Sequence, residues 1–127
     1  MGRVFKTRYF NRWMRKTELT DAALCVAVSE MENGLVDADL GGGVVKKRVP
    51  LPGRGKSGSV RTLVATNKGN RWFFVFGFEK NDRANVSAKE LEALQAIAAD
   101  LLKLSSTELD AHAEGEALQE ICHDSQN

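Results

Sequence analysis

VRTLVATNKGNRWFFVFGF, residues 60–78, decides the fold class of this 127-residue chain. Two runs rich in β-branched and aromatic residues, Val60–Thr66 and Arg71–Phe78, are separated by Asn67-Lys68-Gly69-Asn70. Such runs favour β-strands, and a short connection rich in Asn and Gly favours a tight turn between them. The stretch therefore predicts an antiparallel hairpin.

The second run predicts a strand that is buried on both faces. Its large apolar side chains occupy both alternating sets of positions, with Trp72, Phe74, Phe76 and Phe78 in one set and Phe73, Val75 and Gly77 in the other. A strand with one exposed face alternates apolar and polar residues, so a continuous apolar run indicates a central strand. The aromatic residues are therefore expected in the core; stacking of Trp72 or Phe78 on a nucleic-acid base is the alternative.

The segments on either side of the hairpin complete an α+β domain with a mostly antiparallel sheet. Before the hairpin we expect a strand over residues 3–7, helices over 8–16 and 21–33, and a strand over 44–49 that follows the corner 41–43. After it, Ser87 and Glu90 have the spacing of a capping box and begin another helix. Helices, then strands, then a helix are typical of the α+β class.

Length and composition indicate one globular domain. The apolar fraction of 43% and the charged fraction of 28% exclude disordered and fibrous classes. No apolar run is long enough to cross a membrane, and the N-terminus lacks the apolar stretch of a signal peptide, so we expect a cytoplasmic protein. Cys25 and Cys122 match no metal-ligand spacing. We therefore expect two free thiols in a reducing compartment, no zinc site and no cofactor.

Charge is segregated along the chain, although the formal net charge is only +1. Residues 1–86 contain 16 Lys and Arg against 8 Asp and Glu, whereas residues 87–127 contain 2 against 9. Residues 105–127 contain six acidic residues and no Lys or Arg. The field around the basic part attracts phosphates or acidic proteins.

The central basic residues fall into two clusters flanked by hydrophobic strands. Arg54, Lys56 and Arg61 belong to a glycine-rich loop and the strand after it, and Lys80 and Arg83 follow the aromatic strand. Brought together at one end of the sheet, they would form a phosphate-sized concavity, whereas a solvated basic surface is the alternative. The loop is not a P-loop, because its glycine spacing differs and a strand follows it.

The remaining chemistry favours RNA as the substrate. No paired acids and no Ser/His/Asp or Cys/His set are visible, so proton transfer in the basic concavity falls to a lysine. A lysine crowded by arginines has a lowered pKa, because the neighbouring charges disfavour its charged form. In RNA the ribose 2′-OH is itself a nucleophile, so the protein needs to supply only a base and charge stabilisation.

Three segments together resemble the RelE/ParE superfamily of bacterial toxins, and more narrowly the HigB-like RelE toxins of type II toxin–antitoxin systems. They are GLVDADLGGGVVKKRV at 34–49, the basic loop GRGKSG at 53–58 with Arg61 three residues on, and FGFEKN at 76–81 with Arg83 close behind. The likeness covers about residues 3–104. It implies a small curved antiparallel sheet with N-terminal helices packed on it and a C-terminal helix.

The resemblance also implies an activity: metal-independent cleavage of mRNA on the ribosome, leaving a cyclic phosphate end. By position in the motifs, Lys56 is the general base, Arg54 is its companion in the loop, and Arg61 holds the phosphate. Lys80 or Arg83 stabilises the leaving side. The wider RNA-binding set comprises Lys46, Lys47, Arg48, Asn81 and Arg83. The expected partners are mRNA, the ribosome and a cognate antitoxin with an acidic segment.

Two alternatives stay open within the same fold. One is a toxin that binds gyrase without cutting RNA. The other is a catalytically weak RNA-binding relative, because some members of the family have a catalytic tyrosine or histidine near the C-terminus, whereas the only tyrosine here is Tyr9. The likeness divides the chain into a toxin domain at 1–104 and an acidic extension at 105–127. We expect this extension to be a frayed or partly helical tail, or else to cover the basic face and restrain RNA binding.

Overall fold

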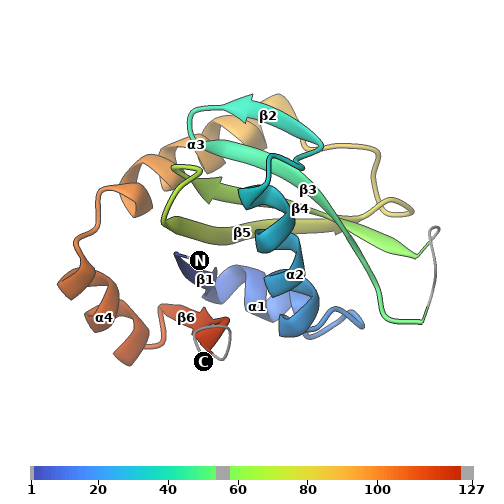
Figure 1. Cartoon of the computed structure of the whole chain (residues 1–127). Helices are drawn as coiled ribbons and strands as arrows, with labels where there is room; N and C mark the ends of the chain where they lie inside the picture. Colours follow the sequence, from blue (N-terminus) through green and yellow to red (C-terminus); the bar gives the residue numbers. More distant parts are fainter. Residues whose placement is uncertain (1, 54–57, 124–127) are drawn as a thin grey trace.

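The computed structural model describes residues 2–53 and 58–123, and these form the α+β fold that the sequence predicts. The predicted elements appear in the expected order, together with three that were not predicted, a strand at 38–41, a helix at 106–114 and a strand at 118–121 (Figure 1). Their bounds are β1 (Arg3–Thr7), α1 (Arg8–Met14), α2 (Asp21–Glu32), β2 (Ala38–Gly41), β3 (Val44–Pro50), β4 (Ser59–Thr66), β5 (Arg71–Glu79), α3 (Ala88–Leu102), α4 (Ser106–Glu114) and β6 (Leu118–Ile121).

The described strands form a single sheet in the order β2-β3-β4-β5-β1-β6. Only the β1–β5 pair is parallel, and the other four pairs are antiparallel. The predicted hairpin is confirmed as β4 and β5. Its turn is held by the Asn67 side chain, whose Oδ1 accepts hydrogen bonds from the backbone N–H groups of Gly69 at 2.9 Å and Arg71 at 3.2 Å. This is the local bonding that makes Asn a turn residue.

Helices cover both faces of the sheet, so each face has its own core. On one face α1 and α2 bury Phe10, Leu24 and Val28 against Trp72 and Phe74. On the other face α3 and α4 bury Leu94, Ala98 and Leu109 against Leu63 and Phe73. We refer to these as the α2 face and the α3 face. The central strand is therefore buried on both sides, as its apolar run predicts.

One detail of the aromatic strand differs from its sequence pattern. Leu63 pairs with Phe76 but Val64 pairs with Phe74, so Val75 is the extra residue of a β-bulge. The bulge reverses the alternation, and Phe76 lies with Phe73 and Val75 on the α3 face instead of with Trp72. Phe78 follows Phe76, with 6.3 Å between the ring centroids. The prediction that Trp72, Phe74, Phe76 and Phe78 share one face is therefore wrong.

The chain after residue 104 continues into the same sheet. Ser105 and Glu108 form the capping box that begins α4, and β6 then pairs antiparallel with β1, from Leu118 opposite Thr7 to Ile121 opposite Val4. Leu109, Leu118 and Ile121 are buried. A frayed tail is therefore wrong for residues 106–121, because three apolar side chains that looked sparse in sequence complete both cores.

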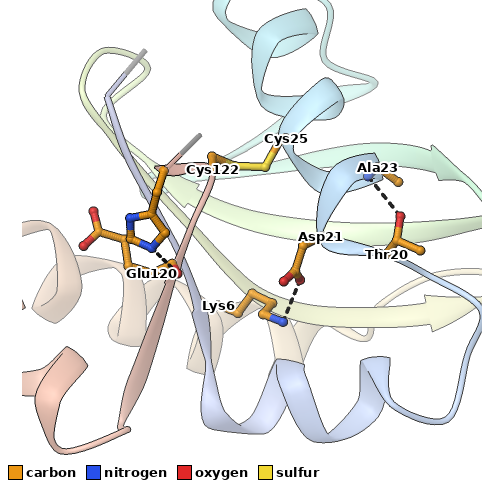
Figure 2. The surroundings of a disulfide bond; sticks show 8 residues. Lys6, Thr20, Asp21, Ala23, Cys25, Glu120 and Cys122 are labelled. Atoms are coloured by element: carbon orange, nitrogen blue, oxygen red, sulfur yellow. Dashed lines mark hydrogen bonds and ion pairs between the residues drawn. A yellow bond between two sulfur atoms is a disulfide. The ribbon is translucent and has the colours of Figure 1, made fainter. Parts of the chain in front are cut away.

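The cysteines form a disulfide, and the expectation of two free thiols is wrong. Pairing of β6 with β1 brings Cys122 against Cys25 in α2, with Cα atoms 5.6 Å apart (Figure 2). Nearby, the buried Lys6 ammonium donates to Asp21 Oδ1 at 2.7 Å. This ion pair joins β1 to the start of α2, whereas the disulfide joins the end of β6 to the same helix. A separation of 97 residues leaves no local spacing from which this pairing can be predicted.

Candidate nucleic-acid interface

Two arginines face each other on the α3 face, at the end of the sheet where β3 ends and β4 begins. Arg48 of β3 pairs with Arg61 of β4, and Arg61 pairs in turn with Phe78 of β5. Directly paired residues have neighbouring side chains, and like charges in such positions repel each other. Arg48 is exposed and Arg61 is half-buried, with Arg61 Nη1 donating to Ser59 Oγ at 3.1 Å. An anion between them would relieve this repulsion.

The glycine-rich loop starts and ends at this same end of the sheet. Leu51 N–H donates to the carbonyl oxygen of Gly58 at 2.8 Å, just beyond the last β3–β4 pair, Pro50 with Ser59. Arg54 and Lys56, the predicted loop residues, lie outside the described residues. The described residues that flank them, Leu51 and Gly58, lie next to the Pro50–Ser59 pair.

The second basic cluster begins at the same end of the sheet. Glu79, the last residue of β5, pairs with Val60 at the start of β4. The chain then turns, with the N–H groups of Asp82 and Arg83 donating to the Glu79 carbonyl oxygen at 3.0 and 3.3 Å. Lys80 and Asn81 are exposed in this turn. The fold thus brings the start of the second cluster to the end of the sheet that carries Arg61.

The Arg83 side chain is held in place by a residue of α3. Its guanidinium forms an ion pair with Glu90 and lies 5.6 Å from the centroid of the Phe76 ring. The hydrogen bond to Glu90 is the main cause of a raised Arg83 pKa, and the same bond is the largest of several causes that lower the pKa of Glu90 to about 2. Arg83 therefore fixes the turn after β5, whereas Lys80 has no ion pair among the described residues and is the more available cation.

Of the three consecutive basic residues in β3, Lys47 does not belong to this surface. Strand alternation directs Lys46 and Arg48 to the α3 face and Lys47 to the α2 face. Lys47 is only 8% exposed, and its Nζ donates to Glu30 at 2.9 Å and to the Leu35 carbonyl oxygen at 2.8 Å. Lys47 therefore lies apart from the other predicted RNA-binding residues of β3, on the opposite face of the sheet.

Tyr9 is the residue of this surface that the sequence analysis missed. Strand β1 pairs with β5 only as far as Phe74, and α1 takes its place beside the rest of β5. Tyr9 of α1 stacks on Phe76, with ring centroids 6.0 Å apart and an interplanar angle of 8°. Tyr9 is nevertheless 57% exposed. Its position in an amphipathic helix beside Phe10 gave the only sequence signal.

The acidic C-terminal segment lies elsewhere. Asp110 and Glu120 both pair with Arg3 of β1, at 2.7 and 2.8 Å, and these contacts raise the Arg3 pKa. Arg3 begins β1 at the end of the sheet opposite Glu79, and Figure 1 shows α4 and β6 on the other side of the molecule from the end of β3 and the start of β4. The acids described after residue 104 therefore do not cover Arg48 or Arg61.

Neither a group of metal-ligating side chains nor a membrane-spanning helix is found in the described part of the chain. Within residues 2–53 and 58–123, no group of three His, Cys, Asp or Glu side chains is placed to hold a metal ion. None of the helices in these ranges is long and apolar enough to cross a membrane.

The family comparison agrees with this fold. Residues 2–121 match the family described as the RelE toxin of the RelE/RelB toxin–antitoxin system. No curated protein matches the chain. Because the family match covers nearly all of the sequence, the chain belongs to the RelE toxin family. It is thus a toxin of a toxin–antitoxin system and has a cognate antitoxin as its partner. The match includes α4 and β6, beyond the motifs at 34–83.

Proposed function

We propose that this toxin is an mRNA interferase, a metal-independent endoribonuclease that cleaves mRNA on the ribosome in the cytoplasm. The observation that carries the proposal is the strand pairing of Arg48 with Arg61 on the α3 face, at the end of the sheet where β3 ends, β4 begins and β5 leads into Lys80. A protein-docking toxin has no need of two cations in directly paired strand positions. The narrower HigB-like assignment and an acidic segment in the antitoxin belong to the same proposal.

The proposed reaction is an internal transesterification of RNA. The 2′-oxygen attacks the adjacent phosphorus, its proton passes to a base, and the bond to the 5′-oxygen of the next nucleotide breaks. The products are a 2′,3′-cyclic phosphate and a 5′-oxygen that takes up a proton. Lys56 in its neutral form is the proposed base, Arg61 and Arg48 stabilise the phosphorane charge, and Lys80 stabilises the leaving oxygen. Arg54 adds charge from the loop.

The test is cleavage of a ribosome-programmed mRNA. We expect wild type to cut, and Arg61→Ala to lose about 10²- to 10³-fold in rate, as for removal of one donor to a developing charge. Lys56→Ala should lose at least as much. Lys68→Ala is the matched control, because Lys68 lies in the β4–β5 turn at the far end of β4 and pairs with Asp39.

A 2′-deoxy substitution at the cut site separates this mechanism from others, since it removes the nucleophile and nothing else. Cleavage that persists on the deoxy message, or that leaves no 2′,3′-cyclic phosphate end, contradicts the proposal. If folded wild type does not cut at all, a gyrase-binding toxin or a non-catalytic RNA-binding protein takes its place, and a gyrase supercoiling assay distinguishes these two.

A further inference from the structure

The surface beside the Arg48–Arg61 pair contains an aromatic ring with one occupied face and one open face. Tyr9 lies almost parallel to Phe76, so Phe76 covers one side of the phenol ring. Since Tyr9 is still 57% exposed, the other side of the ring is open to solvent. Burying that open face would be favourable, and a flat ring is the shape that fits it.

The neighbours of Tyr9 connect it to the cations. Phe76 contacts Phe78 with ring centroids 6.3 Å apart, and Phe78 is the direct strand partner of Arg61. The Arg83 guanidinium also lies over Phe76. A stacking surface next to cations that bind a phosphate is the combination that proteins use for unpaired nucleotides. An acidic peptide would use the cations but would leave the ring without a partner.

We propose that Tyr9 binds one unpaired nucleobase of the RNA by stacking, in a subsite next to the phosphate held by Arg61. This inference rests on the proposed function and adds the nucleotide that the enzyme grips beside the cut. Phe76 supports the ring from behind, and Arg83, fixed by Glu90, supports Phe76. Every base has a flat face, so the subsite accepts different bases and favours purines through their larger area.

Binding of a non-cleavable RNA tests the subsite. The probe is a fully 2′-O-methylated oligonucleotide of about seven nucleotides, intact or with one abasic position at each place in turn. With wild type we expect one abasic position to weaken binding by about 5- to 100-fold. Tyr9→Ala should weaken binding of the intact probe by the same factor and should no longer respond to that abasic position. Tyr9→Phe keeps the ring and should behave as wild type.

The decisive quantity is the coupling between the abasic position in the RNA and the Tyr9→Ala substitution in the protein. Equal abasic losses in wild type and Tyr9→Ala, no sensitive abasic position, or no binding of the intact probe would each overturn the subsite. Thermal unfolding of Tyr9→Ala and Tyr9→Leu checks that the exposed ring is removed without loss of the fold. The proposed function is judged separately by cleavage: coupling without cleavage leaves the subsite and removes the enzyme, whereas cleavage without coupling does the reverse.

Discussion

Cys122, the residue after β6, is joined by a disulfide to Cys25 in the middle of α2, so the last strand of the sheet is pinned to a helix formed near the start of the chain. The bond lies on the α2 face at the β6 edge, whereas Arg48 and Arg61 lie on the α3 face between β3 and β4. The two regions are therefore separated by the sheet and by three strand pairings.

Reducing this bond should lower stability without lowering activity. A disulfide that closes a long loop restricts the unfolded chain, and its loss costs about 2–4 kcal/mol of unfolding free energy. We expect the urea midpoint of wild type to fall in dithiothreitol and that of the double variant Cys25→Ser/Cys122→Ser to match reduced wild type. The reductant should leave the double variant unchanged. An unchanged wild-type midpoint would mean that the bond does not stabilise the fold.

Lys47 and Arg48 are adjacent in sequence but should respond differently to substitution. Arg48→Met removes a cation from the proposed RNA surface, so RNA affinity should fall and the salt slope should decrease by about 0.7 for one phosphate. Lys47→Met leaves that surface intact but removes the donor to the Leu35 carbonyl oxygen. It should lower the unfolding free energy by about 1–3 kcal/mol and leave the salt slope unchanged. Salt titration of RNA binding and urea unfolding of both variants check this, and a slope change in Lys47→Met would contradict it.

The same pair shows how far the sequence reaches. Strand periodicity predicts β3, β4 and β5, and applied residue by residue it also separates Lys47 from Lys46 and Arg48. It fails in β5, because the bulge at Val75 arises from the strand's pairing with β4 and changes the face of every later residue. Tyr9 and the disulfide were missed for a related reason: each depends on a contact between segments far apart in the chain.

Gly77 of β5 lies too close to its neighbours for a side chain to fit. The bulge turns Gly77 towards α1, where an added Cβ would lie 2.2 Å from Cζ3 of Trp13. Gly77→Ala should therefore lower the unfolding free energy by about 1–3 kcal/mol through overpacking. Gly69→Ala is the control, since its Cβ would meet only Asn67 Oδ1 at an ordinary 3.6 Å. Adding Trp13→Leu should recover part of the loss; a purely additive double variant would contradict the steric explanation.

Glu90 should make the fold sensitive to acid. Its pKa falls from 4.5 to about 2 in the folded chain, mainly through the hydrogen bond from Arg83 and also through the Ser87 backbone N–H. A lowered folded pKa means that the unfolded chain binds the proton more readily. The contribution of Glu90 to stability is therefore complete above pH 4.5 and is lost as the pH falls towards about 2.

Glu90→Gln separates this charge effect from helix capping, because the amide oxygen can still accept the Ser87 N–H. Urea midpoints measured across this pH range should fall less steeply for Glu90→Gln than for wild type. Arg83→Gln removes the main cause of the pKa shift and should flatten the curve in the same way. Because Glu90 holds Arg83 over Phe76, Glu90→Gln should also weaken binding of the intact RNA probe at neutral pH. Parallel curves of urea midpoint against pH for all three proteins would contradict the assignment of the acid sensitivity to Glu90.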